Sequence, residues 1–272
     1  MAKGTLWLVS LGPGGLEHLT PAARVALEGA EVVIGYAGYI DLIASVLRPA
    51  EQRVEVRPLG SEMERAREAL ELARGGARVA LVSSGDVGIY AMAGPLFEQL
   101  EVLGWESDEA PEIVVVPGVS AVQAAAARLG APIAHDFCCI SLSDLLTPWD
   151  LIVRRVEAAA QADFVIAFYN PRSGGRHWQL AEARTILQRH RPAVTPVAVV
   201  RAVTRPDEQI TLATLGDLDV SSVDMFSLVL VGNSQTRRWA ARLWTPRGYT
   251  TSGSQGATPA RDVGLPAAPR QP

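Results

Sequence analysis

The chain has 272 residues, of which 48% are hydrophobic and 20% charged, and its formal net charge is −4. This length and apolar content suffice to bury the cores of two modest domains, which we expect in preference to one large domain. The acidic balance argues against a nucleic-acid partner, because phosphate binding requires a basic face. No apolar run approaches the length of a membrane span, and Met1 to Gly4 lead straight into a strand where a signal peptide would stand. We therefore expect a cytoplasmic protein without a membrane partner.

The cysteine and lysine content bears on whether the chain forms disulfides, binds a metal or binds anionic groups. Cys138 and Cys139 are the only cysteines, and because they are adjacent they cannot join distant segments. No cysteine or histidine spacing resembles a zinc site, so we expect neither a disulfide nor a metal. Lys3 is the only lysine, which makes nearly every positive charge an arginine fork suited to carboxylates or phosphates. A GC-rich genome would produce the same bias.

The first half of the chain predicts the alternating strands and helices of a parallel sheet. Thr20 with Pro21 is typical of a helix start, and Ser61 with Glu64 predicts a capping box for a helix that ends at Gly75. The other expected helices cover 22–27, 39–46 and 95–103, and the expected strands cover 5–11, 32–34, 79–83 and 113–116. We assign residues 1–117 to an N-terminal α/β domain with a mostly parallel sheet.

From Ser120 the pattern restarts. Expected helices cover 120–128 and 178–189, and expected strands cover 139–142, 164–169, 197–203, 209–213 and 226–231. The close spacing of the later strands indicates a mixed sheet. We therefore assign residues 118–249 to a C-terminal α/β domain. Residues 250–272 are rich in Ser, Gly, Pro and Ala without periodicity, which predicts a disordered tail.

Three short turns, Gly12 to Gly15, Ser84 to Asp86 and Pro117 to Ala121, each follow an expected strand. Turns of this kind at the carboxyl ends of parallel strands let a ligand approach backbone N–H groups, so together they predict one shared site. The first turn is not a dinucleotide fingerprint, because Glu17 stands where the third glycine is required and Gly35-Tyr36 replaces the expected acid. A single glycine-rich turn serves structure as readily as binding.

Many short motifs together give the chain a recognisable pattern. They are Leu11-Gly12-Pro13-Gly14, Gly35-Tyr36 with Tyr39-Ile40, Ser83 to Gly94, Pro117 to Ala121, Leu129 to Pro132, His135 to Cys138, Ser141 to Trp149, Phe168 to Pro171 with Arg176, and Asn233-Ser234. In this combination the chain resembles the tetrapyrrole (class III) S-adenosylmethionine methyltransferases from Thr5 to about Trp244. The resemblance implies two α/β domains with the cofactor in the cleft between them.

Carried over position by position, the resemblance implies S-adenosyl-L-methionine as the cofactor. The implied contacts are Pro13, Ser84, Gly85, Asp86, Ile89, Ser120, Ala121, Tyr169 and Ala202. Asp86 and strand-end N–H groups can hydrogen-bond the cofactor, while Ile89 and Ala202 supply apolar walls. Asp86 could instead cap a helix. Many relatives carry an acid where this chain has Gly15, so a base role for that acid cannot apply here.

Within the family, the resemblance is greatest to members that methylate precorrin-3B at carbon 17 and contract its ring in aerobic cobalamin biosynthesis. Methyl transfer needs little acid–base help, so positioning is expected to dominate. Ring contraction requires a general base and acid, because a macrocycle hydroxyl must lose a proton. We predict His135 and Asp144 for this role, in a segment expected to face the tetrapyrrole. Each could instead be structural, His135 capping a turn and Asp144 capping the next helix.

The same resemblance points to substrate contacts and leaves alternatives open. Strand-end Arg172, Arg176 and Arg201 are expected to bind macrocycle carboxylates, and Tyr90 to donate a hydrogen bond, although solvent-facing arginines and a core tyrosine would fit the sequence too. A cobalt-containing substrate, cobalt-factor III of the anaerobic pathway, would demand similar surfaces. A non-catalytic tetrapyrrole carrier would retain the same cleft. A homodimer is expected because family members commonly dimerise.

Overall fold

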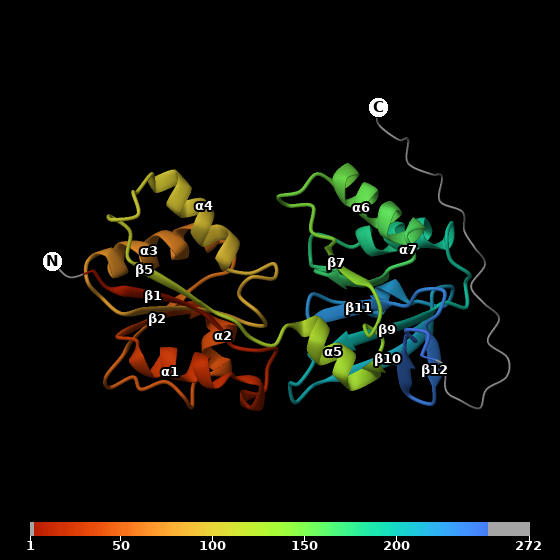
Figure 1. Cartoon of the computed structure of the whole chain (residues 1–272), viewed down its shortest axis with the longest axis horizontal. Helices are drawn as coiled ribbons and strands as arrows, with labels where there is room; N and C mark the ends of the chain where they lie inside the picture. The colour runs from red at the N-terminus through yellow and green to blue at the C-terminus, as the bar shows by residue number, and fades with distance from the viewer. Residues whose placement is uncertain (1–2, 250–272) are drawn as a thin grey trace.

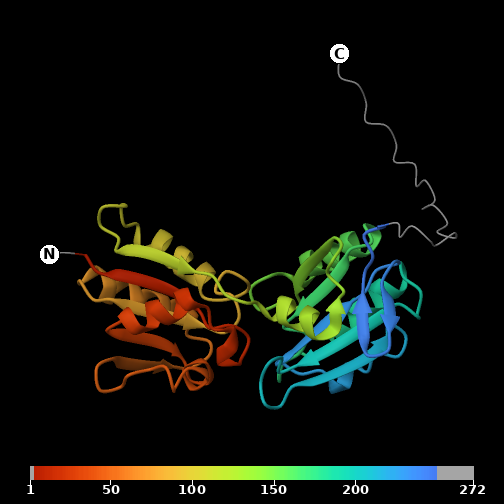
Figure 2. The same cartoon turned by 60° about the horizontal axis from the view of Figure 1, so that its bottom comes forward.

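The computed structural model describes residues 3–249, which form two α/β domains side by side (Figure 1). The disordered tail predicted for 250–272 lies outside the described residues. No helix within the described range is long and apolar enough to cross a membrane. The chain passes from the first sheet to the second through the segment that follows β5 (Figure 2). A domain boundary between residues 117 and 118 stays a prediction.

The N-terminal sheet is wholly parallel, with strand order β3-β2-β4-β1-β5. Its strands are β1 (Thr5–Ser10), β2 (Val32–Tyr36), β3 (Arg53–Arg57), β4 (Val79–Ser83) and β5 (Glu112–Val116). Its helices are α1 (Pro21–Gly29), α2 (Ala37–Leu42), α3 (Glu62–Arg74) and α4 (Ala93–Leu103). Side chains of β1 alternate between the faces: Leu6 and Leu8 pack with α3 and α4, while Val9 packs with α1 and α2 (Figure 1). Both faces are thus covered, as a parallel sheet requires.

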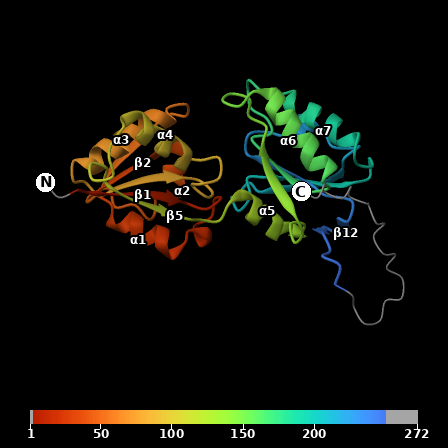
Figure 3. The same ribbon diagram turned by 45° about the horizontal axis from the view of Figure 1, so that its top comes forward.

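The C-terminal sheet is mixed, as predicted, with strand order β10-β9-β11-β8-β7. Its strands are β7 (Phe137–Ser141), β8 (Val165–Tyr169), β9 (Pro196–Arg201), β10 (Gln209–Thr214) and β11 (Ser227–Val231). Only β7 and β8 pair in parallel. Helices α6 (Trp149–Gln161) and α7 (Gln179–Gln188) cover one face, and α5 (Ala121–Leu129) covers the other (Figure 3). A small sheet of β12 (Arg237–Trp239), β13 (Arg242–Trp244) and β6 (Gly130–Ala131) packs beside α5.

The predicted N-terminal caps of α1 and α3 have different outcomes. The cap of α1 is confirmed, because Thr20 Oγ1 accepts from Ala23 N at 3.1 Å and Pro21 begins the helix. The capping box expected at Ser61 is wrong. The backbone there (φ −105°, ψ 34°) is not extended as a capping serine requires, so Ser61 Oγ instead donates to Pro58 O at 2.8 Å.

The small sheet and β3 are not among the elements that the sequence predicts. In β3 two valines alternate with Arg53, Glu55 and Arg57, so it carries too little apolar character to stand out. It is also one of the two edge strands of its sheet, where charged side chains are common.

The central strands β1 and β4 form the switch point of the N-terminal sheet. They are neighbours, yet α1 follows β1 onto one face and α4 follows β4 onto the other. A crevice therefore opens between their carboxyl ends. The turns beyond them are locked by two backbone bonds, Gly12 N to Gly85 O at 3.1 Å and Gly85 N to Gly12 O at 2.7 Å. The fold thus holds two of the predicted binding turns against each other.

Burial on α1 gives a stability prediction with a matched control on the same helix. Leu27 is 1% exposed and packs against the sheet, whereas Val25 is 68% exposed. Leu27→Ala should lower the free energy of unfolding by about 2–5 kcal/mol, because it leaves a cavity in the core. Val25→Ala should change it by less than about 0.5 kcal/mol. Urea unfolding followed by circular dichroism measures both, and equal effects would contradict the packing described.

Candidate functional site

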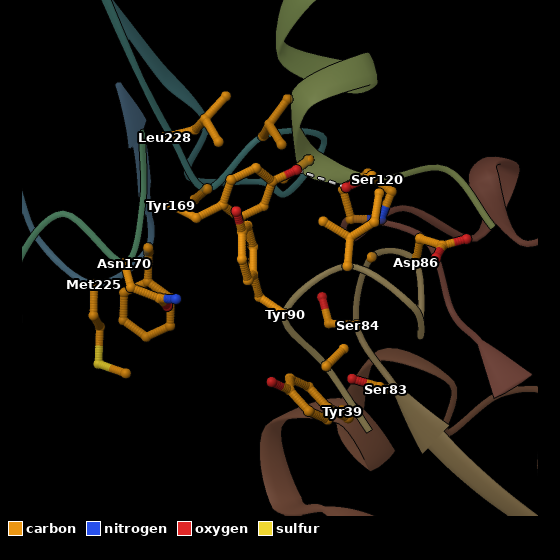
Figure 4. A pocket seen from close by; sticks show the side chains of 18 of the residues that line it. Tyr39, Ser83, Ser84, Asp86, Tyr90, Ser120, Tyr169, Asn170, Met225 and Leu228 are labelled. Atoms are coloured by element: carbon orange, nitrogen blue, oxygen red, sulfur yellow. Dashed lines mark hydrogen bonds between the residues drawn. The ribbon is translucent and has the colours of Figure 1, made fainter. Parts of the chain in front are cut away.

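A cavity of about 540 Å³ lies between the two domains, at the carboxyl ends of β4, β8 and β9 (Figure 4). All nine residues expected to contact the cofactor line it: Pro13, Ser84, Gly85, Asp86, Ile89, Ser120, Ala121, Tyr169 and Ala202. They come from five segments that are remote in the sequence. The structure therefore brings this whole predicted set together in one place.

Asp86 fixes the geometry of the N-terminal wall. Its Oδ1 accepts from Gly88 N at 2.8 Å, and its Oδ2 accepts from Gly118 N at 2.9 Å. The carboxylate thus ties the turn after β4 to the turn after β5. Gly118 is required there, because an added Cβ would lie 2.4 Å from the Cβ of Ser10. Asp86 is consequently a structural brace of the cavity, and each oxygen retains one lone pair for a ligand.

Tyr169 stands at the end of β8 on the opposite wall (Figure 4). Its hydroxyl lies 2.6 Å from Ser120 Oγ and accepts from Val122 N at 3.0 Å. Burial raises the pKa of Tyr169 to about 12, and the hydrogen bonds with Ser120 and Val122 oppose that shift. The phenol therefore stays protonated near neutral pH. It can orient a ligand by hydrogen bonding.

Tyr90 crosses the cleft from the N-terminal domain. Its backbone is left-handed (φ 53°), a conformation that costs a non-glycine residue about 1–3 kcal/mol and occurs at functional sites. Its ring packs on Tyr169 with 5.2 Å between centroids (Figure 4). Its hydroxyl donates to Cys139 O at 2.8 Å. Burial raises the pKa of Tyr90. Tyr90 thus lines the cavity and joins the two domains, while its predicted contact with substrate stays a prediction.

Besides the contacts of Tyr90, the two domains are joined by hydrogen bonds from the turn after β9. Thr204 Oγ1 accepts from Gly15 N at 3.1 Å. Arg205 Nε donates to Pro13 O at 3.1 Å, and Arg205 Nη2 donates to Ser84 Oγ at 3.4 Å. Arg205 also lines the cavity, although the sequence assigned it no role. The signal that could have found it is its position, since it follows a strand whose carboxyl end faces the cleft.

The three arginines predicted to bind substrate do not line the cavity. Arg172 donates to the carbonyl oxygens of Val220 and Ser221, and Arg201 is ion-paired with Asp207 and Asp224. Arg176 is 8% exposed and donates to Asn170 O. Each guanidinium already has partners in its own domain. Their role in substrate binding stays a prediction that this placement does not favour.

The two predicted acid–base residues lie at opposite ends of β7. His135 precedes this strand and Asp144 follows it, and the cavity is at the following end. Five residues at about 3.3 Å each place His135 about 16 Å from that end, so it does not face the cleft as expected. Asp144 accepts from Gln179 Nε2 at 3.0 Å and caps no helix. Neither residue lines the cavity, and Asp144 follows β7 at the end nearer to it.

Three aromatic side chains and one methionine also line the cavity. Tyr36 and Tyr39 enter from the start of α2, and Met225 and Phe226 enter beside β11. Burial raises the pKa of Tyr39, while the charges of Arg65 and Arg205 oppose that shift. Tyr36 and Tyr39 belong to motifs visible in the sequence, but no role followed from the motif alone.

Several known proteins are similar to this chain in sequence and in fold. The family model described as Tetrapyrrole (Corrin/Porphyrin) Methylases matches residues 5–219. The cobalt-factor III methyltransferase of Priestia megaterium is 45% identical over 247 residues, which cover 91% of this chain and 45% of that protein. The precorrin-3B C(17)-methyltransferase of a Sinorhizobium species is 44% identical over 236 residues, 86% of this chain and 91% of that protein.

Among solved structures, the methyltransferase CobJ superposes with a TM-score of 0.84 at 40% sequence identity, covering 89% of this chain and 100% of that chain. The chain thus spans less than half of the Priestia relative and nearly all of the Sinorhizobium one. The family model alone extends over most of the described residues. The chain therefore belongs to the tetrapyrrole (corrin/porphyrin) methylases.

Proposed function

We propose that this protein uses S-adenosyl-L-methionine to methylate precorrin-3B at carbon 17 and to contract its ring to precorrin-4, in aerobic cobalamin biosynthesis. The observation that carries the proposal is the convergence of all nine expected cofactor residues on one cavity between the domains. Membership of the tetrapyrrole methylases and 44% identity to a protein named for this reaction support it. Action in the cytoplasm as a homodimer is part of the same proposal.

The residues present fit S-adenosyl-L-methionine. Gly85 has a positive φ of 71°, and the space where its Cβ would stand is open, so a ligand can approach the backbone there. Ser84 and Asp86 offer oxygens for ribose or amine groups, and Ile89 and Ala202 offer apolar contacts. The cofactor, when bound, supplies a methyl group made electrophilic by its sulfonium.

The chain's own contribution to methyl transfer is positioning. Two rigid walls, braced by Asp86 on one side and Tyr169 on the other, hold the ligands in a fixed relation. Holding reacting atoms in line at near-attack distance contributes about 7–11 kcal/mol to lowering a barrier. Ring contraction additionally moves a proton. Asp144, which follows β7 at the end nearer the cleft, is the candidate for that step.

A cobalt-containing macrocycle is the second candidate substrate. The Priestia relative, named for cobalt-factor III, is as similar to this chain as the precorrin-3B relative, at 45% against 44% identity. Both candidates are modified tetrapyrroles with similar outer surfaces.

Incubation with each macrocycle tests the proposed reaction. With S-adenosyl-L-methionine and precorrin-3B, the product should gain one methyl group by mass and show the absorption spectrum of a contracted ring. Turnover of cobalt-factor III alone would move the assignment to the second candidate. Binding of either macrocycle without any mass change would identify a carrier and overturn the proposal.

Glycine substitutions test the cofactor site with a matched control. Gly85 and Gly104 both have positive φ, 71° and 61°, and both have open space at the Cβ position, but only Gly85 lines the cavity. Alanine at either position should cost a similar 1–2 kcal/mol or so of stability from left-handed backbone strain. Only Gly85→Ala should weaken binding of S-adenosylhomocysteine in calorimetry. Equal affinities in the two variants would place the ligand elsewhere.

An asparagine substitution tests the acid–base assignment. Asp144→Asn removes the ionisable group but keeps an oxygen that can accept from Gln179 Nε2. Loss of a general acid or base should slow ring contraction by about 10²- to 10⁴-fold and leave methylation nearly unchanged. A methylated, uncontracted macrocycle should then accumulate in mass spectra. Fully contracted product at the wild-type rate would show that Asp144 is structural.

A further inference from the structure

Arg205 is the one cation that lines the cavity among residues 3–249, and Asp86 is the one anion. Both oxygens of Asp86 already accept backbone N–H groups. Within the same range, the partners of Arg205 are Pro13 O, Ser84 Oγ and the ring of Phe226. No described carboxylate lies within ion-pair distance of it. A positive charge without a negative partner therefore faces the space where the ligands would bind.

The other arginines near this edge have different surroundings. Arg201 has two carboxylate partners, Asp207 and Asp224. Arg172 and Arg176 are bound to backbone carbonyls and lie outside the cavity. A ligand carboxylate entering the cavity would thus find one guanidinium among the lining residues, with no direct ion pair to a described carboxylate.

The hydrogen bonds of Arg205 hold its side chain in place. Nε and Nη2 contact the N-terminal domain, although Arg205 itself follows β9 of the C-terminal domain. Nη1 has no protein partner among the described residues. A guanidinium that is already fixed loses little conformational entropy when it binds, and its planar donors match the geometry of a carboxylate.

We propose that Arg205 binds a carboxylate of a ligand in this cavity. The inference rests on the proposed function, because the cofactor and the tetrapyrrole of that function both carry carboxylates. One source is the methionine moiety of the cofactor, and the other is the acetate and propionate side chains of the tetrapyrrole. The chemistry of recognition is the same for both, a charge-assisted hydrogen bond from a guanidinium to a carboxylate.

Binding measurements on Arg205→Gln distinguish the two sources. Calorimetry compares S-adenosylhomocysteine with methylthioadenosine, which lacks the amino-acid carboxylate, and absorption titration without cofactor measures precorrin-3B. If Arg205 holds the cofactor, S-adenosylhomocysteine should bind about 10- to 150-fold more weakly and methylthioadenosine as before. If Arg205 holds the macrocycle, the same loss should appear for precorrin-3B alone. In either case raised salt should weaken the affected ligand more in wild type than in the variant.

Two controls separate recognition of a ligand charge from the loss of hydrogen bonds that join the two domains. Thr204→Val removes the bond from Gly15 N without changing charge, so any loss it causes should be equal for S-adenosylhomocysteine and methylthioadenosine. Arg24→Gln removes an exposed charge on α1 and should change nothing. Equal losses for all three ligands in Arg205→Gln and Thr204→Val would reduce Arg205 to a structural bridge and overturn the inference.

The remaining outcomes are also distinct. If wild type binds the three ligands and Arg205→Gln binds them equally well, the inference fails while the proposed function stands. If wild type binds none of the ligands, the proposed function fails and the inference fails with it.

Discussion

The pair of backbone hydrogen bonds between Gly12 and Gly85 is the constraint on which the candidate site depends. These bonds join the turns after β1 and β4, two neighbouring strands whose following helices lie on opposite faces of the sheet. Asp86 joins these two turns to the turn after β5, because its carboxylate accepts a hydrogen bond from Gly118 N. Three turns from distant parts of the chain thus form one wall, because Gly12 and Gly85 exchange backbone hydrogen bonds and Gly118 N donates to the Asp86 carboxylate.

The second wall is fixed to the first by side chains that cross the cleft. Tyr90 reaches from the N-terminal domain to Cys139 O, and Arg205 reaches back from the C-terminal domain to Pro13 O. The cavity is therefore defined by contacts in both directions. Such an arrangement suits a reaction in which the protein contributes position more than acid–base chemistry, because the distance between two bound ligands is set by both domains.

The residues expected to contact the cofactor lie together as the sequence suggests, because they belong to turns whose position is set locally by the strands before them. Ser84, Gly85 and Asp86 must lie at the carboxyl end of β4 wherever that strand runs. The arginines predicted to bind substrate are different, because the direction of an arginine side chain depends on partners distant in the sequence. Arg201 pairs with Asp224, and Arg172 donates to Ser221 O. The same limit explains why Arg205 was missed.

His135 shows a further limit, since it was placed near the substrate by neighbourhood in sequence. The direction of β7, set by its pairing with β8, carries it to the far end of the strand. Edge strand β3, with charges alternating between its valines, likewise gains its place only from pairing with β2. Turn chemistry is local, whereas strand direction and side-chain partners are tertiary properties.

Hydrogen–deuterium exchange with and without S-adenosylhomocysteine tests the central claim most directly, that the crossing contacts enclose one cofactor site. Ligand should slow exchange of backbone amides in 84–89, 118–122 and 202–205 together, because these segments form the two walls. Amides of β12 and β13, which lie outside the cavity, should exchange at an unchanged rate. Protection confined to one domain, or to β12 and β13, would contradict the account.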